Sequence, residues 1–376
     1  MAEITLKGLA HSYEKTPKGA ADYAIRQMDH VWHQGGAYAL LGPSGCGKST
    51  LLNIISGLLE PSEGDVLFDG QRVNELPPEE RNIAQVFQLP VIYDTMTVFD
   101  NLAFPLRNMN TPEYRVKPKV LEVADILELT SLLDRKAKNL TADEKQKVSM
   151  GRGLVRDDVT AILFDEPLTV IDPQLKWKLR RKLKEIHERF NITMIYVTHD
   201  QLEASTFADK IAVMYEGQVV QFGTPRELFE RPAHTFVGYF IGSPGMNFMA
   251  VEYRDDQVMF GTHPLPVSEQ MKHAVANASS ANAIANDISY NNIKLGIRPE
   301  FIAIASNPTA DSVPIQVTSV QDLGTYSLLT FKLNEQTFKA RLPEGHPPVG
   351  EAAFAHFDAA HVALYIDEYL VEAGHE

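Results

Sequence analysis

The first 236 residues alternate short apolar runs with longer stretches whose apolar residues recur at helical spacing. The runs at 37–41, 160–164 and 194–197 have the length and composition of buried strands. Strands that alternate with helices in this way are typical of a largely parallel sheet covered by helices. We therefore expect an α/β domain over residues 1–236.

Two helices have clear start signals. The first follows "DP", where Asp172 suits the N-cap and Pro173 suits the first turn. Its apolar residues recur at helical spacing and predict core packing, not a binding face: Leu175, Leu179, Leu183, Ile186 and Phe190. The second helix is expected at "TPRE", where Thr224 and Glu227 have the spacing of a capping box.

The pattern changes after about residue 238. Short β-like runs at 316–320, 328–333, 337–341 and 362–366 are separated by Gly, Pro and Asn, which predicts a small all-β domain over 237–376. Residues 269–292 are rich in Ala, Asn and Ser with little apolar pattern, so we expect an exposed insertion there.

Composition and charge argue against a nucleic-acid-binding protein and against a secreted or membrane-spanning one. The 376 residues carry 35 Lys and Arg against 49 Asp and Glu, a net charge of −14, which argues against a phosphate-backbone binder and hence against a nucleic-acid partner. The single cysteine fits a reducing compartment. We find no signal-peptide pattern in "MAEITLKGLAH" and no apolar run of membrane-spanning length, so we expect a cytoplasmic chain.

A phosphate-binding loop is the strongest chemical signal in the sequence. "GPSGCGKST" satisfies G-x-x-x-x-G-K-[ST] between the strand at 37–41 and an apolar helical run. Backbone amides of such a loop curl around phosphates, the lysine neutralises phosphate charge, and the serine can ligate Mg²⁺. The alternative, a chance glycine turn, does not account for the strand and helix around it. The nucleotide-binding residues are then Gly42, Pro43, Ser44, Gly45, Cys46, Gly47, Lys48, Ser49 and Thr50.

Two acids end the apolar strand in "AILFDEP". Asp165 suits Mg²⁺ directly or through water, and Glu166 suits the polarisation of an attacking water. By itself this would be an ordinary solvated strand end. Together with the phosphate loop it predicts a nucleotide site, because such sites collect at the carboxyl ends of parallel strands.

These motifs, in their order, resemble the ATPase subunit of an ATP-binding-cassette (ABC) transporter over residues 1–236. "GPSGCGKST" is followed by "QVFQ", "LTADEKQ", "LFDEP", "LTVID" and "VTH". The resemblance implies that Asp165 is the Walker B acid and Glu166 the catalytic base. It also implies that Gln88 links Mg²⁺ and water to the membrane subunits and that His199 senses the γ-phosphate. Taken alone, Gln88 and His199 would have structural roles.

Two further residues follow from the same resemblance. Asp172 fits the D-loop, which is compatible with its role as a helix cap. Tyr13 in "AHSYEK" resembles the aromatic residue that stacks on adenine. An exposed-loop tyrosine is the alternative for Tyr13, and Tyr23 competes for the role.

The resemblance extends to importers of the maltose and glycerol-phosphate type, whose ATPases carry an OB-like regulatory β domain. "LGIRPE" at 295–300 falls where those proteins have a similar motif. One of the two distinct ATPases of bacterial glycerol importers is most similar in the segments "NIAQVFQLPVIYDTMTVFDNLAFPL", "LTADEKQK" and "HTFVGYFIGSPGMNF". The resemblance implies ATP hydrolysis coupled to solute import, with ATP and Mg²⁺ as cofactors and Ser49, Gln88 and Asp165 around the metal. It also implies membrane permease subunits, a solute-binding protein, and a peripheral position on the cytoplasmic face of the membrane.

The signature segment departs from the family's LSGGQ and reads Leu140-Thr141-Ala142-Asp143-Glu144. In the family this segment covers ATP held by a partner subunit, and Thr141 keeps one hydroxyl for that contact. Thr141 and Glu144 also have capping-box spacing, so the helix start is expected to persist. Cβ atoms hinder close backbone approach, and the carboxylate of Asp143 opposes phosphate.

We interpret the altered signature as a sign of an asymmetric heterodimer with a second, non-identical ATPase. Two alternatives stay open: a regulatory nucleotide-binding subunit with little hydrolysis, and a soluble ABC ATPase without a transport role. The acidic balance and the single cassette argue against the second, and the intact Glu166 and His199 argue against the first.

Overall fold

A computed structural model describes residues 2–156, 159–169, 171–265, 267–284, 292–309 and 311–373. The chain divides into two compact units, Met1–Pro225 and Arg226–Glu376. An α/β unit is followed by a β-rich unit, as the sequence predicts. The division falls before the expected residue 236 and assigns α9 (Thr235–Phe240) and most of α8 (Pro225–Glu230) to the second unit.

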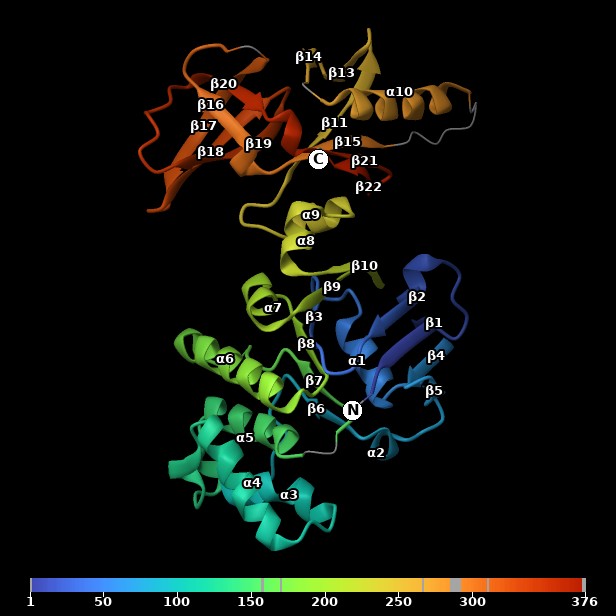
Figure 1. The fold of residues 1–376 in the computed structure, drawn as a ribbon, viewed down its shortest axis with the longest axis vertical. Helices are drawn as coiled ribbons and strands as arrows, with labels where there is room; N and C mark the ends of the chain where they lie inside the picture. Colours follow the sequence, from blue (N-terminus) through green and yellow to red (C-terminus); the bar gives the residue numbers. More distant parts are fainter. Residues whose placement is uncertain are drawn as a thin grey trace. The chain divides into compact units, whose positions relative to one another are not determined.

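Two sheets form the framework of the first unit (Figure 1). A six-stranded sheet has the order β10-β9-β3-β8-β7-β6, and only β10 runs antiparallel to its neighbour. Its strands are β10 (Gln218–Gly223), β9 (Lys210–Tyr215), β3 (Ala37–Leu41), β8 (Met194–Thr198), β7 (Ala161–Asp165) and β6 (Ile83–Val86). The second sheet contains β2 (Tyr23–Trp32), β1 (Ile4–Ser12), β4 (Glu63–Phe68) and β5 (Gln71–Arg72). The three strands predicted for this unit are confirmed.

The helices of the first unit follow from their buried stripes. The α1 helix (Lys48–Ser56) packs its apolar residues into a core shared by both sheets. The predicted helix after Asp172 is α6 (Pro173–Phe190), and Leu179, Leu183 and Ile186 are buried as expected. The remaining helices are α2 (Pro78–Arg81), α3 (Val98–Asn108), α4 (Glu113–Ile126), α5 (Ala142–Leu154) and α7 (Gln201–Phe207). Figure 1 shows α3, α4 and α5 gathered in a helical subdomain.

Strand register decides where the site forms. Leu41 of β3 pairs with Thr198 of β8, and Asp165 of β7 pairs with Val197. The carboxyl ends of these parallel strands therefore lie at one edge of the sheet, together with the end of β6. Loops that follow strands at such an edge carry the nucleotide-binding groups of open α/β folds.

The second unit is built from three antiparallel sheets around one core. The first contains β11 (Asn247–Ala250), β15 (Ile293–Ile297), β21 (Val362–Ile366) and β22 (Tyr369–Ala373). The second contains β12 (Glu252–Arg254), β13 (Gln257–Phe260) and β14 (His263–Pro264). The third contains β16 (Ile302–Ala305), β20 (Ala352–Phe357), β17 (Ser312–Asp322), β18 (Tyr326–Leu333) and β19 (Gln336–Pro343). All four strands predicted for this domain are confirmed.

The expected exposed insertion at 269–292 is wrong in its first part. Residues Glu269–Ile284 form a helix, α10, and residues 285–291 lie outside the described part of the chain. Met271 and Val275 of α10 are completely buried in the core of the second unit. Their i, i+4 spacing was the signal for an anchored helix, and the surrounding Ala, Asn and Ser obscured it.

None of the helices among the described residues is long and apolar enough to cross a membrane.

The arginine of "LGIRPE" organises the second unit. Arg298 is 2% exposed, and its guanidinium donates from Nε to Phe229 O at 2.7 Å and from Nη1 to Ile241 O at 2.7 Å. These carbonyls belong to the C-terminal ends of α8 and α9, where a cation is favoured. Burial lowers the pKa of Arg298 to about 10. The motif is therefore explained by a structural role.

Replacing Arg298 with methionine is expected to destabilise the second unit by roughly 2–4 kcal/mol, because two carbonyls lose their donor. Trp32 and Trp177 both lie in the first unit, so tryptophan fluorescence does not report on this change. We would measure hydrogen exchange in peptides that cover β15. Arg341→Met, on an exposed arginine, is the control, and equal exchange in both variants would contradict the prediction.

Candidate active site

The phosphate loop joins β3 to α1 and depends on glycine at its end. Gly47 is the N-cap of α1 and has φ of 102°, in the left-handed region. A Cβ atom at this position would lie 2.4 Å from Ala24 O, so a side chain is excluded by space as well as by conformation. Ser44 and Gly45 at the tip of the loop are exposed. The loop therefore presents its backbone to solvent ahead of a helix N-terminus.

The side chain of Lys48 packs against the inner side of this loop and contacts its carbonyls. The side chain is buried, and its ammonium donates to Gly42 O at 2.9 Å and to Pro43 O at 2.8 Å. Cys46 Sγ lies 3.9 Å from the same ammonium, and burial raises the pKa of the thiol. Cys46 is thus a packed thiol, and Lys48 is a cation held by neutral carbonyls that an anionic ligand can replace.

Ser49 and Asp165 meet across the loop. Ser49 Oγ donates to Asp165 Oδ1 at 3.0 Å. Burial is the main cause that raises the pKa of Asp165, and the Ser49 hydrogen bond opposes it. A hydroxyl and a carboxylate in contact are hard oxygen ligands of the kind that Mg²⁺ prefers. No cluster of three His, Cys, Asp or Glu side chains that could hold a metal occurs in the described part of the chain, so a metal here would also need phosphate or water oxygens.

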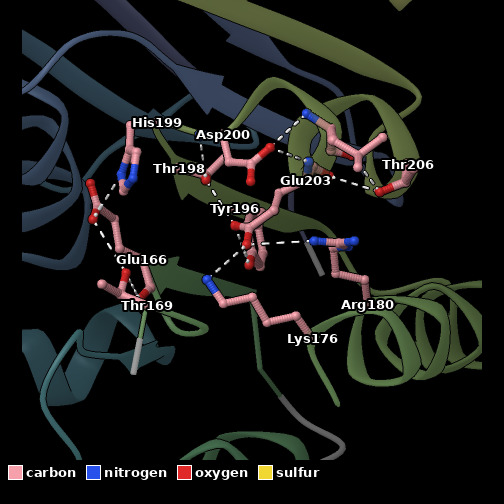
Figure 2. Close-up of polar contacts among 11 residues, drawn as sticks. Glu166, Thr169, Lys176, Arg180, Tyr196, Thr198, His199, Asp200, Glu203 and Thr206 are labelled. Carbon is pink, nitrogen blue, oxygen red and sulfur yellow. Dashed lines mark hydrogen bonds and ion pairs between the residues drawn. The ribbon is translucent and has the colours of Figure 1, made fainter. Parts of the chain in front are cut away.

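Glu166 and His199 also lie together, as Figure 2 shows. His199 Nδ1 is 3.2 Å from Glu166 Oε2, and Thr169 Oγ1 donates to Glu166 O at 3.1 Å. Glu166 has φ of 46°, an unusual conformation for a residue with a side chain, and its amide donates to Val197 O at 3.1 Å. The side chain of Glu166 is 18% exposed and that of His199 is 56% exposed, so the pair can reach a ligand from the solvent side.

Gln88 lies apart from this group. It is an exposed residue shortly after β6, and none of the hydrogen bonds among the described residues joins it to Ser49 or Asp165. The preceding carbonyl is fixed, because Gln146 Nε2 of α5 donates to Phe87 O at 3.1 Å. The loop that carries Gln88 is therefore attached to the helix that begins at the signature segment. Sequence reasoning missed Gln146.

The two candidate adenine-stacking tyrosines differ in their surroundings. Tyr13 is 67% exposed, its hydroxyl is 3.1 Å from Thr50 Oγ1 of α1, and its ring packs edge-on against His11. Tyr23 instead donates to Glu63 Oε1 at 3.0 Å. Of the two, Tyr13 is the exposed ring whose hydroxyl lies beside the residue that ends the phosphate loop.

The predicted capping box at the signature is confirmed. Thr141 Oγ1 accepts from Glu144 N at 3.3 Å, and Glu144 Oε2 accepts from Thr141 N at 2.7 Å, at the start of α5. The side chain of Asp143 is 28% exposed, and its Oδ2 lies 3.8 Å from Lys147 Nζ one turn later. Burial raises the pKa of Asp143 despite this lysine. Of the two altered positions, Ala142 is exposed, and Asp143 is half-buried beside Lys147 of the same helix.

A buried carboxylate behind His199 was also missed. Glu203 is 5% exposed and lies on the stripe of α7 that buries Ala204 and Phe207. An ionisable residue on an otherwise apolar stripe was the available signal, because such residues are almost never buried unless paired.

Comparisons with known proteins agree with the motifs. A family model described as "ABC transporter" matches residues 25–169, and one described as "TOBE domain" matches residues 295–364. The sn-glycerol-3-phosphate import ATP-binding protein UgpC of Pectobacterium atrosepticum is 36% identical over 97% of this chain and 98% of its own. The oligosaccharides import ATP-binding protein MsmX of Bacillus subtilis is 36% identical over 91% of both chains. The trehalose import ATP-binding protein SugC of Mycobacterium tuberculosis is 36% identical over 97% and 96%.

Solved structures are similar as well. CbiO1 of Clostridium perfringens, part of the ABC transporter complex cbiONQ, matches with a TM-score of 0.55 and 27% identity over 61% of this chain and 90% of its own. The ATP-binding cassette MJ0796, a dimer in a post-hydrolysis state with ADP and phosphate, matches with a TM-score of 0.52 and 28% identity over 59% and 98%.

Proposed function

The chain belongs to the ATP-binding subunits of ABC transporters, and from this membership we propose that it powers the import of a small polyol or carbohydrate. As a member of this family it binds and hydrolyses ATP. The observation that carries the proposal is the meeting of Ser49 with Asp165 and of Glu166 with His199 at one edge of the sheet. The names of the relatives support the class of solute, and the segments that resemble glycerol importers favour glycerol or glycerol 3-phosphate.

In the proposed mechanism the phosphate loop binds the phosphates of ATP. Its amides and Lys48 neutralise their charge, and Lys48 exchanges two carbonyl partners for phosphate oxygens. Tyr13 stacks on the adenine. Ser49 and Asp165 would hold Mg²⁺, Gln88 is a further candidate ligand, and the ion would supply charge neutralisation at the phosphates.

Glu166 is the proposed base. A water attacks the γ-phosphorus, the bond to the β-γ bridging oxygen breaks, and the proton of the water goes to a Glu166 carboxylate oxygen. His199 holds that carboxylate through Nδ1. While Nδ1–H donates to Glu166, the ring donates to a phosphate oxygen from Nε2 only when both nitrogens are protonated.

The proposed partners are permease subunits in the membrane and, through them, a solute-binding protein. We place the chain on the cytoplasmic face of the membrane, where the region from Gln88 to Pro105, a loop followed by the first part of α3, would contact the permease. The exposed Leu89 and Val91 in this loop support such a contact. Uptake of labelled glycerol, glycerol 3-phosphate and trehalose by cells that have or lack this chain tests the solute class. Unchanged uptake of all three would contradict it.

We further propose that the chain works beside a second, non-identical ATPase. The altered signature carries this proposal, because Ala142 and Asp143 carry Cβ atoms where close backbone approach to phosphate is expected. The native mass of the complex isolated from its own cells tests it. One copy beside a different ATPase would support it, and two copies of this chain without another ATPase would contradict it.

Restoring glycine at Ala142 and Asp143 is expected to raise turnover of the assembled complex about twofold. A site that lacks one oxyanion donor is slowed by roughly a hundredfold or more, so it adds little until it is repaired. Phosphate release at saturating ATP measures the change. Ala142→Gly alone is the control, because Asp143 still lies at the helix start, and an unchanged rate in the double variant would contradict the proposed role of the segment.

A regulatory subunit with little hydrolysis is the second candidate, favoured only by the altered signature. The contact between Glu166 and His199 supports catalysis instead.

A further inference from the structure

Four side chains contact the buried carboxylate of Glu203, which lies on the helix that follows His199 (Figure 2). Its Oε2 accepts from Thr198 Oγ1 at 2.8 Å and from Tyr196 OH at 3.2 Å. Its Oε1 lies 3.5 Å from Arg180 Nη1 and 3.7 Å from Lys176 Nζ. The carboxylate of Glu203 therefore has hydrogen-bond donors on one oxygen and cations near the other, which is the condition for keeping it charged in the interior.

Thr198 connects this cluster to the backbone of His199. Its Oγ1 donates to Glu203 and accepts from Asp200 N at 3.0 Å. Asp200 is the N-cap of α7, and its Oδ1 accepts from Leu202 N at 2.8 Å and Glu203 N at 3.1 Å. The peptide that links His199 to Asp200 is thus held on one side by Thr198 and on the other by the start of α7.

The same carboxylate reaches the helix that follows the D-loop. Lys176 and Arg180 belong to α6, which begins directly after Asp172. On the other side of that loop, Thr169 donates to Glu166 O at 3.1 Å. Contacts therefore run from α6 through Glu203 and Thr198 to His199, and from His199 through Glu166 to Thr169.

Ion pairs between α6 and α7 are not required for packing alone. Apolar side chains of similar volume commonly fill such a space with equal or greater stability. Glu203 also orients the hydroxyl of Thr198, and this hydroxyl accepts a hydrogen bond from the amide of the His199–Asp200 peptide. An apolar side chain at position 203 could not orient Thr198 in this way.

We propose that Glu203 is a positioning residue for hydrolysis: through Thr198 it fixes the backbone of His199, and through Lys176 and Arg180 it ties that backbone to α6. The inference rests on the proposed function, because it takes Glu166 and His199 as the reacting pair. Thr169 and α6, which lie before and after the D-loop, are then both joined to the pair by side-chain contacts. Positioning of this kind acts on the rate of the chemical step more than on ATP binding.

Three conservative variants test the proposal in the assembled complex. Thr198→Val removes the hydroxyl that links Glu203 to the Asp200 amide, and Thr198→Ser keeps it. Tyr196→Phe removes the other hydroxyl on Glu203 Oε2, which does not serve the His199–Asp200 peptide. We expect Thr198→Val to lower kcat about tenfold with KM for ATP within about twofold. We expect the other two variants to keep both values within about twofold.

Thermal midpoints are measured for all three, because each touches a buried residue. The proposal would be overturned in favour of a purely structural role if Thr198→Val and Tyr196→Phe lost kcat equally and in proportion to their loss of thermal midpoint. Unchanged kcat in Thr198→Val would overturn it as well. Glu203→Gln combined with Thr198→Val should cost no more than the larger single effect, since both act along one path.

Glu166→Gln in the same assembled complex separates failure of the proposed function from failure of the positioning role of Glu203. If it leaves turnover intact, the proposed function fails whatever the Thr198 variants do. If it abolishes turnover and Thr198→Val has no effect, only the positioning role of Glu203 fails.

Discussion

Turnover is expected to fall by about a hundredfold or more when Glu166 is replaced with glutamine, while ATP binding is kept. Glutamine has the same shape and still accepts a hydrogen bond from His199, 3.2 Å away in the native chain. It cannot take a proton from the attacking water. Release of phosphate at saturating ATP measures the rate, and binding of a fluorescent ATP analogue measures affinity.

Glu185→Gln is a matched control for this change, because Glu185 is exposed on α6 and pairs with the exposed Arg181 and Lys182. We expect it to keep turnover within about twofold, as exposed pairs contribute little. If Glu166→Gln behaves like this control, then hydrolysis takes place at the partner's site. The chain would then be a regulatory nucleotide-binding subunit.

Much of the site could be predicted because its signals are local. The glycines and lysine of 42–50 are adjacent in sequence, and β3 (Ala37–Leu41) ends where the pattern predicts. The meeting of Ser49 with Asp165 followed from a general property, since parallel strands bring their carboxyl ends to one edge. The capping box at Thr141 needed only the spacing of two residues.

The contacts that the sequence did not predict depend on tertiary packing. The stripe of α7 indicates that Glu203 is buried, but its partners Lys176 and Arg180 are known only once α6 packs against it. The orientation of Asp143 likewise depends on burial at the start of α5, where Lys147 offers a partner. In α10, Met271 and Val275 are buried in the core of the second unit although the composition of the helix resembles a linker. For Glu203, a distant element determines the environment of the side chain, and periodicity within α7 does not name its partners. For Asp143 and α10 the sequence spacing was present, but it does not say how deeply the residues are buried.

Loss of ATP binding is the expected result of replacing Lys48 with methionine, which keeps most of the volume of the buried stem and removes the ammonium. Two effects combine in this variant. The phosphates lose a cation that is worth more in a partly buried site than in water. The loop loses the two hydrogen bonds from Nζ to Gly42 O and Pro43 O, so its carbonyls are no longer held inward.

We expect affinity for ATP to fall by about a hundredfold or more, roughly 3 kcal/mol. Equilibrium binding of ATP measures the loss, and Lys7→Met on an exposed lysine of β1 is the control. The thermal midpoint without nucleotide separates the two effects. A lower midpoint with unchanged affinity would mean that Lys48 only holds the loop, and the phosphate site would have to be sought elsewhere. A large loss of affinity with a nearly unchanged midpoint assigns the ammonium to the phosphates, because the loop then keeps its shape through the packing of Gly47 and α1.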